Sequence, residues 1–311
     1  MIKLLMIGCN VGTESMPKYF REQCNYSELR LDNQLANNLS NLYAKNEIPD
    51  TIFLQIQSDT IDGKNTNAYI GGIIKAFRDK GAFVINWTGD LRNTTPPWMV
   101  EFAKNVSITM FSNMRDVEYC KARGINTGFL QQGIDTNIFR PDGVKGNAPE
   151  IVFLANNYVN QFPLSGFRKE AINLLRRKYG NRFKVYGNGW GADSGNVNNS
   201  QYEEAKIYRS AKIAISISHY NVDRYFSDRL GRALCSGTFV ISHNYKGIGK
   251  DFEVDKQLVT FNDLNDMCNK IDYWLNPEQE EARLAIARAG QEQASKEFSY
   301  QNIIKQILEL K

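Results

Sequence analysis

The sequence contains few of the side chains that bind transition metals. Its 311 residues include two histidines and five cysteines, and the cysteines stand singly, without a Cys-x-x-Cys pair. Because a zinc site needs several such ligands at close spacing, we expect no metal site. Single cysteines are typical of reduced thiols, and they predict a cytoplasmic protein.

Long apolar segments and an excess of one charge are also absent from the sequence. No apolar run approaches the roughly 20 residues that span a membrane. The opening run MIKLLMIGC contains Lys3 and is too short for a signal peptide, so it predicts a first strand. The chain has 38 basic and 34 acidic side chains, a net charge of +4. This balance does not indicate a long nucleic-acid footprint, although folding can still gather a local basic patch.

The first half of the chain alternates short apolar runs with segments of helical spacing. The runs cover residues 2–8, 51–57, 82–87, 107–112 and 127–133, and the helical segments cover 33–46, 67–80 and 114–123. Strands that alternate with helices in this way predict an α/β fold, in which helices cover both faces of a parallel sheet.

The same alternation restarts after a turn-rich segment at residues 140–150. Strands are expected over 151–156, 183–187, 212–218, 238–242 and 257–261, and helices over 166–179, 201–210, 228–236, 263–275 and 278–311, the last with a break near Phe298. We therefore predict Rossmann-like domains over 1–145 and 146–295, with a helix over 296–311 that packs back on the first. Ligands are expected in a cleft between two such domains, at the carboxyl ends of the strands.

Two segments resemble a known enzyme family. The segment QQGIDTNIFRP (131–141) resembles the NGVD-x-x-x-F-x-P segment of retaining GT-B glycosyltransferases, with Gly133, Asp135, Phe139 and Pro141 in matching places. The segment YFSDRLGRALCSGTFVIS (225–242) resembles the carboxyl-terminal half of that superfamily, especially its CgeB-like, or spore-maturation, branch. The resemblance implies a GT-B fold whose two parallel sheets face each other across a cleft. It also implies that the second domain holds the nucleotide-sugar donor and the first holds the acceptor.

Transfer of a sugar from a nucleoside diphosphate requires stabilisation of the negative charge on the departing diphosphate. GT-B enzymes usually supply it with cationic side chains and helix N-termini, and the chain has no plausible Asp-x-Asp metal motif. Arg168, at a helix start, is one candidate for this role, and a solvated helix arginine is the alternative. Arg229 is another, because an arginine in a first helical turn opposes the helix dipole. With Ser227 or Asp228 as the cap, Arg229 can bind phosphate, or it can form a local salt bridge with Asp228.

Two arginines depart from the pattern of the larger retaining family. Arg224 and Arg232 stand where that family has the two glutamates of a Glu-x7-Glu motif, the second of which accepts hydrogen bonds from the donor ribose. Ribose recognition therefore cannot be copied from the family. Arg232 is expected either to contact phosphate or to be a paired arginine at the edge of the core.

Two glycine-containing loops complete the expected donor site. The loop after strand 183–187 contains Gly187, Asn188, Gly189 and Trp190, and it resembles the family's donor loop. Trp190 can shield a base or sugar, or it can be ordinary packing. In the loop after the first strand, Gly12 and Thr13 would face the donor phosphates.

The acceptor side is expected at the carboxyl end of strand 82–87. The residues of this group are Trp87, Thr88, Gly89, Asp90, Arg92 and, from a neighbouring strand, Gln57. Asp90 can orient or deprotonate an acceptor hydroxyl, or it can simply cap a turn. His219, which ends strand 212–218, is either a cleft residue or a structural histidine.

These residues together predict a glycosyltransferase, hexosyl- or pentosyl-transferring, which uses a nucleotide-diphosphate sugar as its co-substrate, with a UDP-sugar first among the choices. No other cofactor and no metal are expected, and retention is favoured, although Asp90 acting as a base would permit inversion. The acceptor is a hydroxyl of a glycan, a small molecule or a modified DNA base. A non-catalytic nucleotide-sugar-binding protein and a sugar-nucleotide epimerase are the alternatives.

Overall fold

The computed structural model describes residues 1–8, 16–197 and 199–311. The chain divides into two compact units, one formed by Met1–Gln132 with Ile303–Lys311 and the other by Gly133–Asn302. The domain boundaries that we predicted after residues 145 and 295 therefore differ from the boundaries of the two compact units, which lie after Gln132 and Asn302. Residues 133–145 belong to the second unit because Phe139 lies in its core and Arg209 donates to the carbonyl oxygens of Ile138 and Val144.

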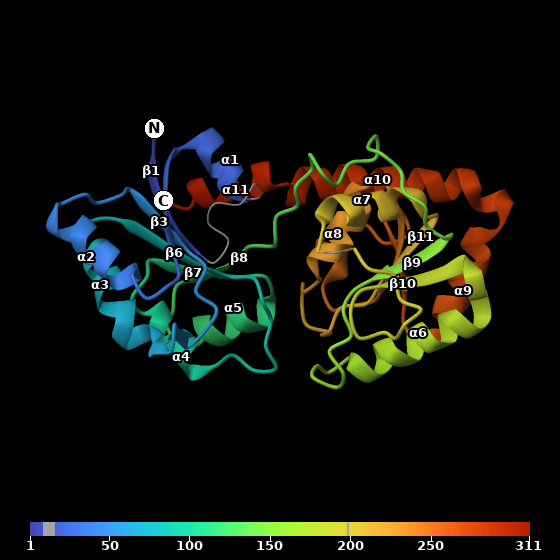
Figure 1. Ribbon diagram of the computed structural model, residues 1–311, viewed down its shortest axis with the longest axis horizontal. Coiled ribbons are helices and arrows are strands. Elements are labelled where there is room, and N and C mark those ends of the chain that lie inside the picture. The colour runs from blue at the N-terminus through green and yellow to red at the C-terminus, as the bar shows by residue number, and fades with distance from the viewer. Residues whose placement is uncertain (9–15, 198) are drawn as a thin grey trace. The chain divides into compact units, whose positions relative to one another are not determined.

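The first unit is built on a six-stranded parallel sheet in the order β2-β1-β3-β6-β7-β8 (Figure 1). Its strands are β1 (Lys3–Gly8), β2 (Asn25–Arg30), β3 (Thr51–Leu54), β6 (Phe83–Thr88), β7 (Ile108–Phe111) and β8 (Thr127–Phe129). Every residue of β3 is buried, as expected for a central parallel strand that helices cover on both faces. The predicted strands of this half are confirmed, although most are shorter than expected.

The first unit also contains elements that the hydrophobic pattern does not reveal. Its helices are α1 (Met16–Gln23), α2 (Leu35–Ala44), α3 (Gly72–Asp79, after a π-helical turn at Asn67–Gly71), α4 (Pro97–Ala103) and α5 (Met114–Lys121), and β4 (Thr60–Ile61) pairs with β5 (Lys64–Asn65) in a hairpin. Of these, α1, α4, the hairpin and strand β2 were not predicted. The sequence of β2, NYSELR, is polar and only partly buried because this strand lies at the edge of the sheet.

The second unit has a five-stranded parallel sheet in the order β10-β9-β11-β12-β13. Its elements are β9 (Ile151–Leu154), α6 (Ser165–Tyr179), β10 (Phe183–Tyr186), α7 (Gln201–Ser210), β11 (Ile213–Ser216), α8 (Asp228–Cys235), β12 (Phe239–His243), β13 (Val259–Phe261), α9 (Leu264–Leu275) and α10 (Glu280–Phe298). The last helix, α11 (Tyr300–Leu308), begins in this unit, and from Ile303 onward it belongs to the first unit. The predicted strands and helices of this half are all present. The expected break is confirmed at Ser299, where the Ile134 N–H donates to the Phe298 carbonyl oxygen.

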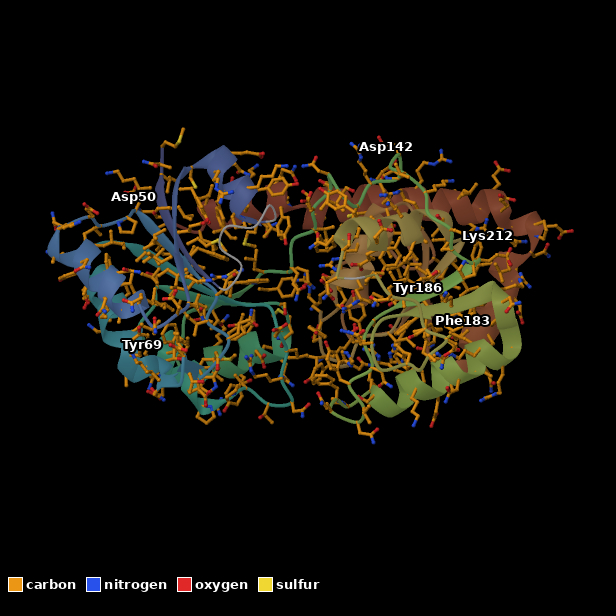
Figure 2. All side chains as sticks on the ribbon, viewed as in Figure 1. Asp50, Tyr69, Asp142, Phe183, Tyr186 and Lys212 are labelled. Atoms are coloured by element: carbon orange, nitrogen blue, oxygen red, sulfur yellow. The ribbon has the colours of Figure 1, made fainter. Side chains whose placement is uncertain are left out.

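Two apolar layers cover the faces of the second sheet. One contains residues of α7 and α8 with Val152 and Leu154, and the other contains residues of α6 and α9 with Ile151 and Phe153. Successive residues of β9 thus face opposite layers, as the pleat of a strand requires. Figure 2 shows the side chains that fill the unit, among them Phe183 and Tyr186 of the edge strand β10.

The topology of the second sheet marks one place where a ligand is expected. The first strand of this sheet, β9, pairs with β10 on one side and with β11 on the other. After β9 the chain forms β10 on one side and then crosses back past β9 to form β11 on the other, so the direction of the strand order reverses between β9 and β11. In open α/β sheets, ligands bind beyond the carboxyl ends of the strands at such a switch point. None of the described helices is both long and apolar enough to cross a membrane.

Candidate functional site

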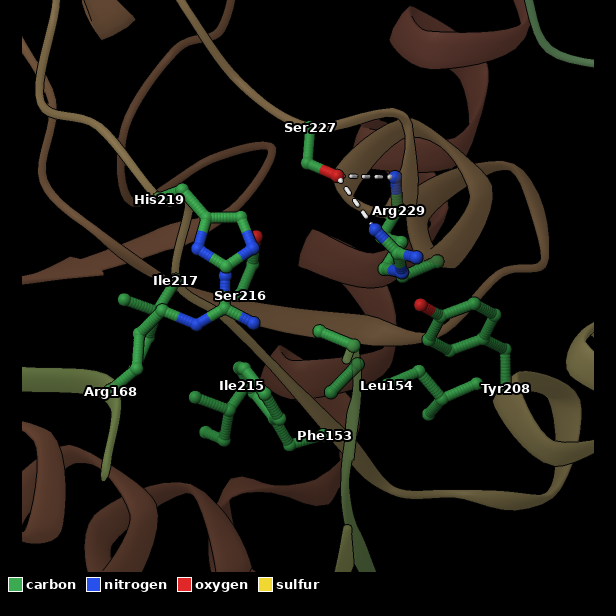
Figure 3. Close-up of a pocket in the computed structure, with 13 residues that line it drawn as sticks. Phe153, Leu154, Arg168, Tyr208, Ile215, Ser216, Ile217, His219, Ser227 and Arg229 are labelled. Atoms are coloured by element: carbon green, nitrogen blue, oxygen red, sulfur yellow. Dashed lines mark hydrogen bonds between the residues drawn. The ribbon is translucent and has the colours of Figure 1, made fainter. Parts of the chain in front are cut away.

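A small cavity lies in the second unit at the carboxyl ends of β9 and β11, the switch point of the sheet (Figure 3). Its volume of about 20 Å³ accommodates about one water molecule, so only part of a larger ligand can enter it. The cavity is lined by Phe153, Leu154, Ala155, Arg168, Tyr208, Ala214, Ile215, Ser216, Ile217, His219, Ser227, Arg229 and Ala233. Two arginines thus line the cavity and, among the described residues, no carboxylate does.

Arg168, in the first turn of α6, is a buried cation. It is 3% exposed, its Nη2 donates to the Asn156 carbonyl oxygen at 3.1 Å, and its guanidinium lies 5.3 Å from the centre of the Phe153 ring. Within the described parts of the chain, no carboxylate forms an ion pair with it. Burial and the charge of Arg229 lower the pKa of Arg168 to about 9. A buried charge without a counter-ion is costly, so an anionic ligand would be stabilised here.

Arg229 contributes the second positive charge from the start of α8. Ser227 caps this helix, and its Oγ accepts from the backbone N–H and from Nη1 of Arg229, both at 3.4 Å. The Asp228 carboxylate is 3.8 Å from Arg229 Nη1, near the outer limit of an ion pair. The expected cap at Ser227 is therefore present, while the alternative salt bridge to Asp228 is long and leaves Arg229 able to bind an anion.

Asp228 makes its close contact with Arg232, at 2.7 Å, and Arg232 also pairs with Glu204 on α7, at 2.8 Å. Burial alone would lower the pKa of Arg232, but the two carboxylates raise it above its ordinary value. Arg232 does not line the cavity. Of the two arrangements that the sequence left open for Arg232, the structure has the paired arginine at the edge of the core, where it also lies over Phe139.

Arg224, at the other departure from the glutamate pattern, is held in the same way. Its Nε and Nη2 donate to Asp251 Oδ1 at 2.9 and 2.7 Å, and the Asp251 side chain is fully buried. Both arginines at the glutamate positions thus pair with buried acids of their own unit.

The glycines of the loop after β10 are needed for a close approach to the loop after β9. A Cβ on Gly187 would lie 2.4 Å from the Ala155 carbonyl oxygen, and one on Gly189 would lie 2.6 Å from that of Asn157. Both glycines have positive φ values, 130° and 81°, which other residues rarely adopt. The backbone N–H of Asn188 donates to Asn156 Oδ1 at 2.9 Å. These contacts fix the loop beside the cavity.

Trp190, in contrast, belongs to the core. It is 6% exposed, its Nε1 donates to the Ala155 carbonyl oxygen, and its ring packs edge-on against Phe153 at 5.9 Å. Of the two roles that the sequence left open for Trp190, the structure has ordinary packing, because the indole is enclosed within the core of the second unit. Gly12 and Thr13 lie outside the described residues.

In the first unit, the structure brings the predicted acceptor-side residues together at the carboxyl edge of the sheet. Arg92 donates to the backbone carbonyl oxygens of Gln57 and, at 3.3 Å, Asp90. The Gly89 carbonyl oxygen accepts from Ser112 Oγ at 2.7 Å. Trp87 is buried, and its Nε1 donates to a backbone carbonyl oxygen. It therefore supports the loop from within the core.

Three side-chain atoms at this edge are buried without a hydrogen-bond partner among the described residues: Gln57 Oε1, Thr88 Oγ1 and Gln131 Nε2. Buried polar atoms usually have hydrogen-bond partners. A polar ligand could therefore donate to Gln57 Oε1, accept from Gln131 Nε2, and do either with Thr88 Oγ1. Gln131 was missed because we placed it inside the strand predicted over 127–133, whereas β8 ends at Phe129. Its polar side chain near the carboxyl end of that predicted strand is the signal that could have found it.

Glu204 was also missed, because an acid in the first turn of a helix normally faces solvent. It is only 6% exposed, and the structure makes it a partner of Arg232. The signal was its spacing, since Glu204, Ile207 and Tyr208 lie on one helix face and the latter two are core residues. The described residues bring together no group of three His, Cys, Asp or Glu side chains that could hold a metal ion.

Comparisons with known proteins agree with this architecture. The protein-family model described as "Glycosyl transferase-like" matches residues 168–309, the stretch that includes Arg168 and Arg229. Sucrose-phosphate synthase from Thermosynechococcus elongatus is similar in structure, with a TM-score of 0.68 and 11% sequence identity over 99% of this chain and 98% of that chain. Anabaena Alr3699/HepE in complex with UDP and glucose is similar too, with a TM-score of 0.64 and 13% identity over 99% and 98%.

A glycosyltransferase from Rickettsia africae has a TM-score of 0.65 and 13% identity over 99% of this chain and 97% of that chain. No curated protein sequence matches the chain. At such low identity, these structures show the fold. The chain is an α/β protein with the GT-B glycosyltransferase fold, and its carboxyl-terminal part carries the glycosyl transferase-like sequence pattern.

Proposed function

We propose that this protein is a glycosyltransferase that binds a nucleoside diphosphate sugar at the cavity of the second unit. The observation that carries the proposal is the buried Arg168, which has no carboxylate partner among the described residues and lies beside Arg229 at the switch point of the sheet. Guanidinium groups form strong, charge-assisted hydrogen bonds with phosphate oxygens. A diphosphate is thus the ligand whose charge the site complements.

The same groups support a mechanism for bond cleavage. When the glycosidic bond to the diphosphate breaks, the leaving oxygen gains negative charge, and fixed cations at that place lower the barrier. Arg168, Arg229 and the N-terminal N–H groups of α8 would supply this stabilisation. In this proposal the arginines fulfil the role that a divalent cation has in metal-dependent transferases, so no further cofactor is needed.

We propose that the carboxyl edge of the first sheet binds the hydroxyl-bearing acceptor. Thr88, Gln57 and Gln131 supply the buried polar atoms without described partners, and Asp90 is the carboxylate that could accept the hydroxyl proton. Asp90 acting as a base would give inversion, whereas the likeness to retaining GT-B enzymes, and to their CgeB-like branch, favours retention. The proposed acceptor is a hydroxyl of a glycan, a small molecule or a modified DNA base. The sugar that the enzyme transfers to this acceptor is a hexose or a pentose.

The test is binding and turnover over a panel of donors. Because HepE is described in complex with UDP and glucose, the panel begins with UDP-sugars and continues with GDP-, ADP- and dTDP-sugars. Binding is measured by calorimetry, and the product's anomeric configuration is measured by NMR after incubation with glycans, small hydroxyl compounds and modified DNA, with and without a chelator. We expect binding of one donor class and chelator-resistant transfer.

Other outcomes would separate the alternatives. Tight binding without turnover would support a non-catalytic nucleotide-sugar-binding protein. Conversion of the donor sugar without any acceptor would support an epimerase. Neither binding nor turnover across the panel would reject the proposal.

A further inference from the structure

His219 lines the same cavity as Arg168 and Arg229, at the end of the segment that leaves β11 (Figure 3). Its Nδ1 is buried and has no hydrogen-bond partner among the described residues. The imidazole packs against the rings of Phe162, at 4.4 Å, and Tyr158, at 5.4 Å. These aromatic contacts hold the ring in place but satisfy neither of its nitrogens.

The charged groups that face His219 are both positive: Arg168 on α6 and Arg229 on α8. From the loop after β9, Tyr158 contributes an aromatic ring with a neutral hydroxyl. In the described lining of the cavity there is no acid. Burial and the two arginines therefore lower the pKa of His219 to about 3, and the imidazole is neutral at physiological pH when the cavity holds no anion.

We propose that His219 is a third ligand of the donor diphosphate and that binding of the diphosphate adds a proton to its imidazole. This inference rests on the proposed function, which places the diphosphate between Arg168 and Arg229. Two negative charges there would offset the positive charges that keep the imidazole neutral, and phosphate oxygens would accept its N–H. The proton comes from solvent, and no covalent bond is made or broken at His219.

Protonation of His219 has a consequence for the reaction. An imidazolium beside the diphosphate adds a third positive charge where the leaving group becomes more negative. Stabilisation of developing charge by fixed groups is the main source of rate enhancement in such sites. By linkage, donor affinity should rise as the pH falls through the pKa of His219 in the complex, by about tenfold per pH unit if one proton is taken up.

The chain is well suited to a direct measurement because it contains two histidines. We would label the histidine rings for NMR, assign His219 by its loss in His219→Gln, and titrate the full chain from pH 4.5 to 8.5 with and without donor. UDP-glucose, GDP-mannose and ADP-glucose are the probes. Their diphosphates carry no monoester phosphate, the group that titrates near pH 6. His243→Gln is the matched control, since His243 packs between Phe167 and Phe261 and does not line the cavity.

Without donor, we expect the His219 ring to show no titration in this pH range, and with bound donor we expect it to titrate within the range, while the behaviour of His243 stays unchanged. His219→Gln should bind the donor less tightly than the wild type at pH 5.5 and should lack the increase in affinity toward low pH, which a purely structural role would not remove. A donor that binds without moving the His219 titration, or with the same pH dependence in His219→Gln, would overturn this inference and leave the proposed function intact. Failure of the wild type to bind any of the probes or the wider panel would count against both.

Discussion

Four arginines of the second unit fall into two pairs with opposite surroundings. Arg224 and Arg232 each lie within 2.8 Å of a buried carboxylate, supplied by Asp251 and Glu204. Arg168 and Arg229 line the cavity, where the described residues offer only the distant Asp228 contact of Arg229, at 3.8 Å. The first pair has its counter-ions within the fold, whereas the second pair has no close carboxylate among the described residues, and this difference is the basis of the proposed anion site.

The comparison also shows how the fold accommodates arginines at the two positions where the resembled pattern has glutamates. Arg232 pairs with both Glu204 and Asp228, and the Asp228 carboxylate therefore lies closer to Arg232, at 2.7 Å, than to Arg229, at 3.8 Å. Sequence position alone therefore does not distinguish a structural arginine from a ligand-binding one. The carboxylates within reach do.

The largest expected effect comes from removing Arg232, one of the two arginines in this comparison that pair closely with a buried carboxylate. Arg232→Met would leave the carboxylates of Glu204 and Asp228 without their cation, and removal of one partner of a buried ion pair costs about 3–5 kcal/mol. We expect the free energy of unfolding, measured by urea denaturation at pH 7, to fall by that amount. The control is Arg176→Met, whose partner Asp193 is largely exposed, and which should cost below about 1 kcal/mol. If the two substitutions lowered the free energy of unfolding equally, the pairing of Arg232 with Glu204 and Asp228 would contribute no more to stability than a surface ion pair.

The second prediction concerns Arg168, which has no carboxylate partner among the described residues. Arg168→Met removes a buried charge that has no described counter-ion, so the free energy of unfolding without donor should change by less than about 1 kcal/mol or increase. Donor affinity should fall roughly 10- to 150-fold, because a hydrogen bond to a charged group contributes about 1.5–3 kcal/mol. Arg177→Met, exposed on the same helix, is the control for both measurements. A strongly destabilised Arg168→Met with unchanged affinity would assign Arg168 a structural role.

Much of the fold could be predicted because the buried strands are continuous apolar runs. Strands such as β3 and β9, in which every residue is buried, are visible in the sequence alone. The edge strand β2 and the short helix α4 were missed because one is polar and the other is seven residues long, beginning at Pro97. Their formation depends on neighbours that the local sequence does not reveal.

The cavity was predicted in part, for a similar reason. Arg168 and Arg229 could be selected because they follow strands at helix starts, where sheet topology brings side chains together. The partners of Arg232 could not, because Glu204 is 28 positions away and its burial is a property of the packed helix. Likewise, Trp190 is enclosed by Phe153 and the Ala155 carbonyl oxygen, contacts that exist only after β9 and β10 have paired.

The smallest expected effect comes from substitution of Glu204, one of the two carboxylates that pair with Arg232. Burial raises the pKa of Glu204 above its ordinary 4.5, against the opposing charge of Arg232. The native state therefore retains a proton that the unfolded chain has lost, and the stability that this carboxyl contributes is present below pH 4.5 and is lost as the pH rises through its native pKa. Glu204→Gln cannot ionise, so its free energy of unfolding relative to the wild type should increase from pH 4.5 upward.

Urea denaturation of both proteins at several pH values between 4 and 8 would measure this difference. Its size should stay below that of Arg232→Met, because Asp228 continues to pair with Arg232 when Glu204 is neutral. Glu203→Gln on the same helix is the control, since Glu203 is exposed and pairs with Lys206 at the surface. A difference that instead decreased with rising pH would mean that Arg232 outweighs burial at Glu204, and the network would then stabilise the ionised carboxylate.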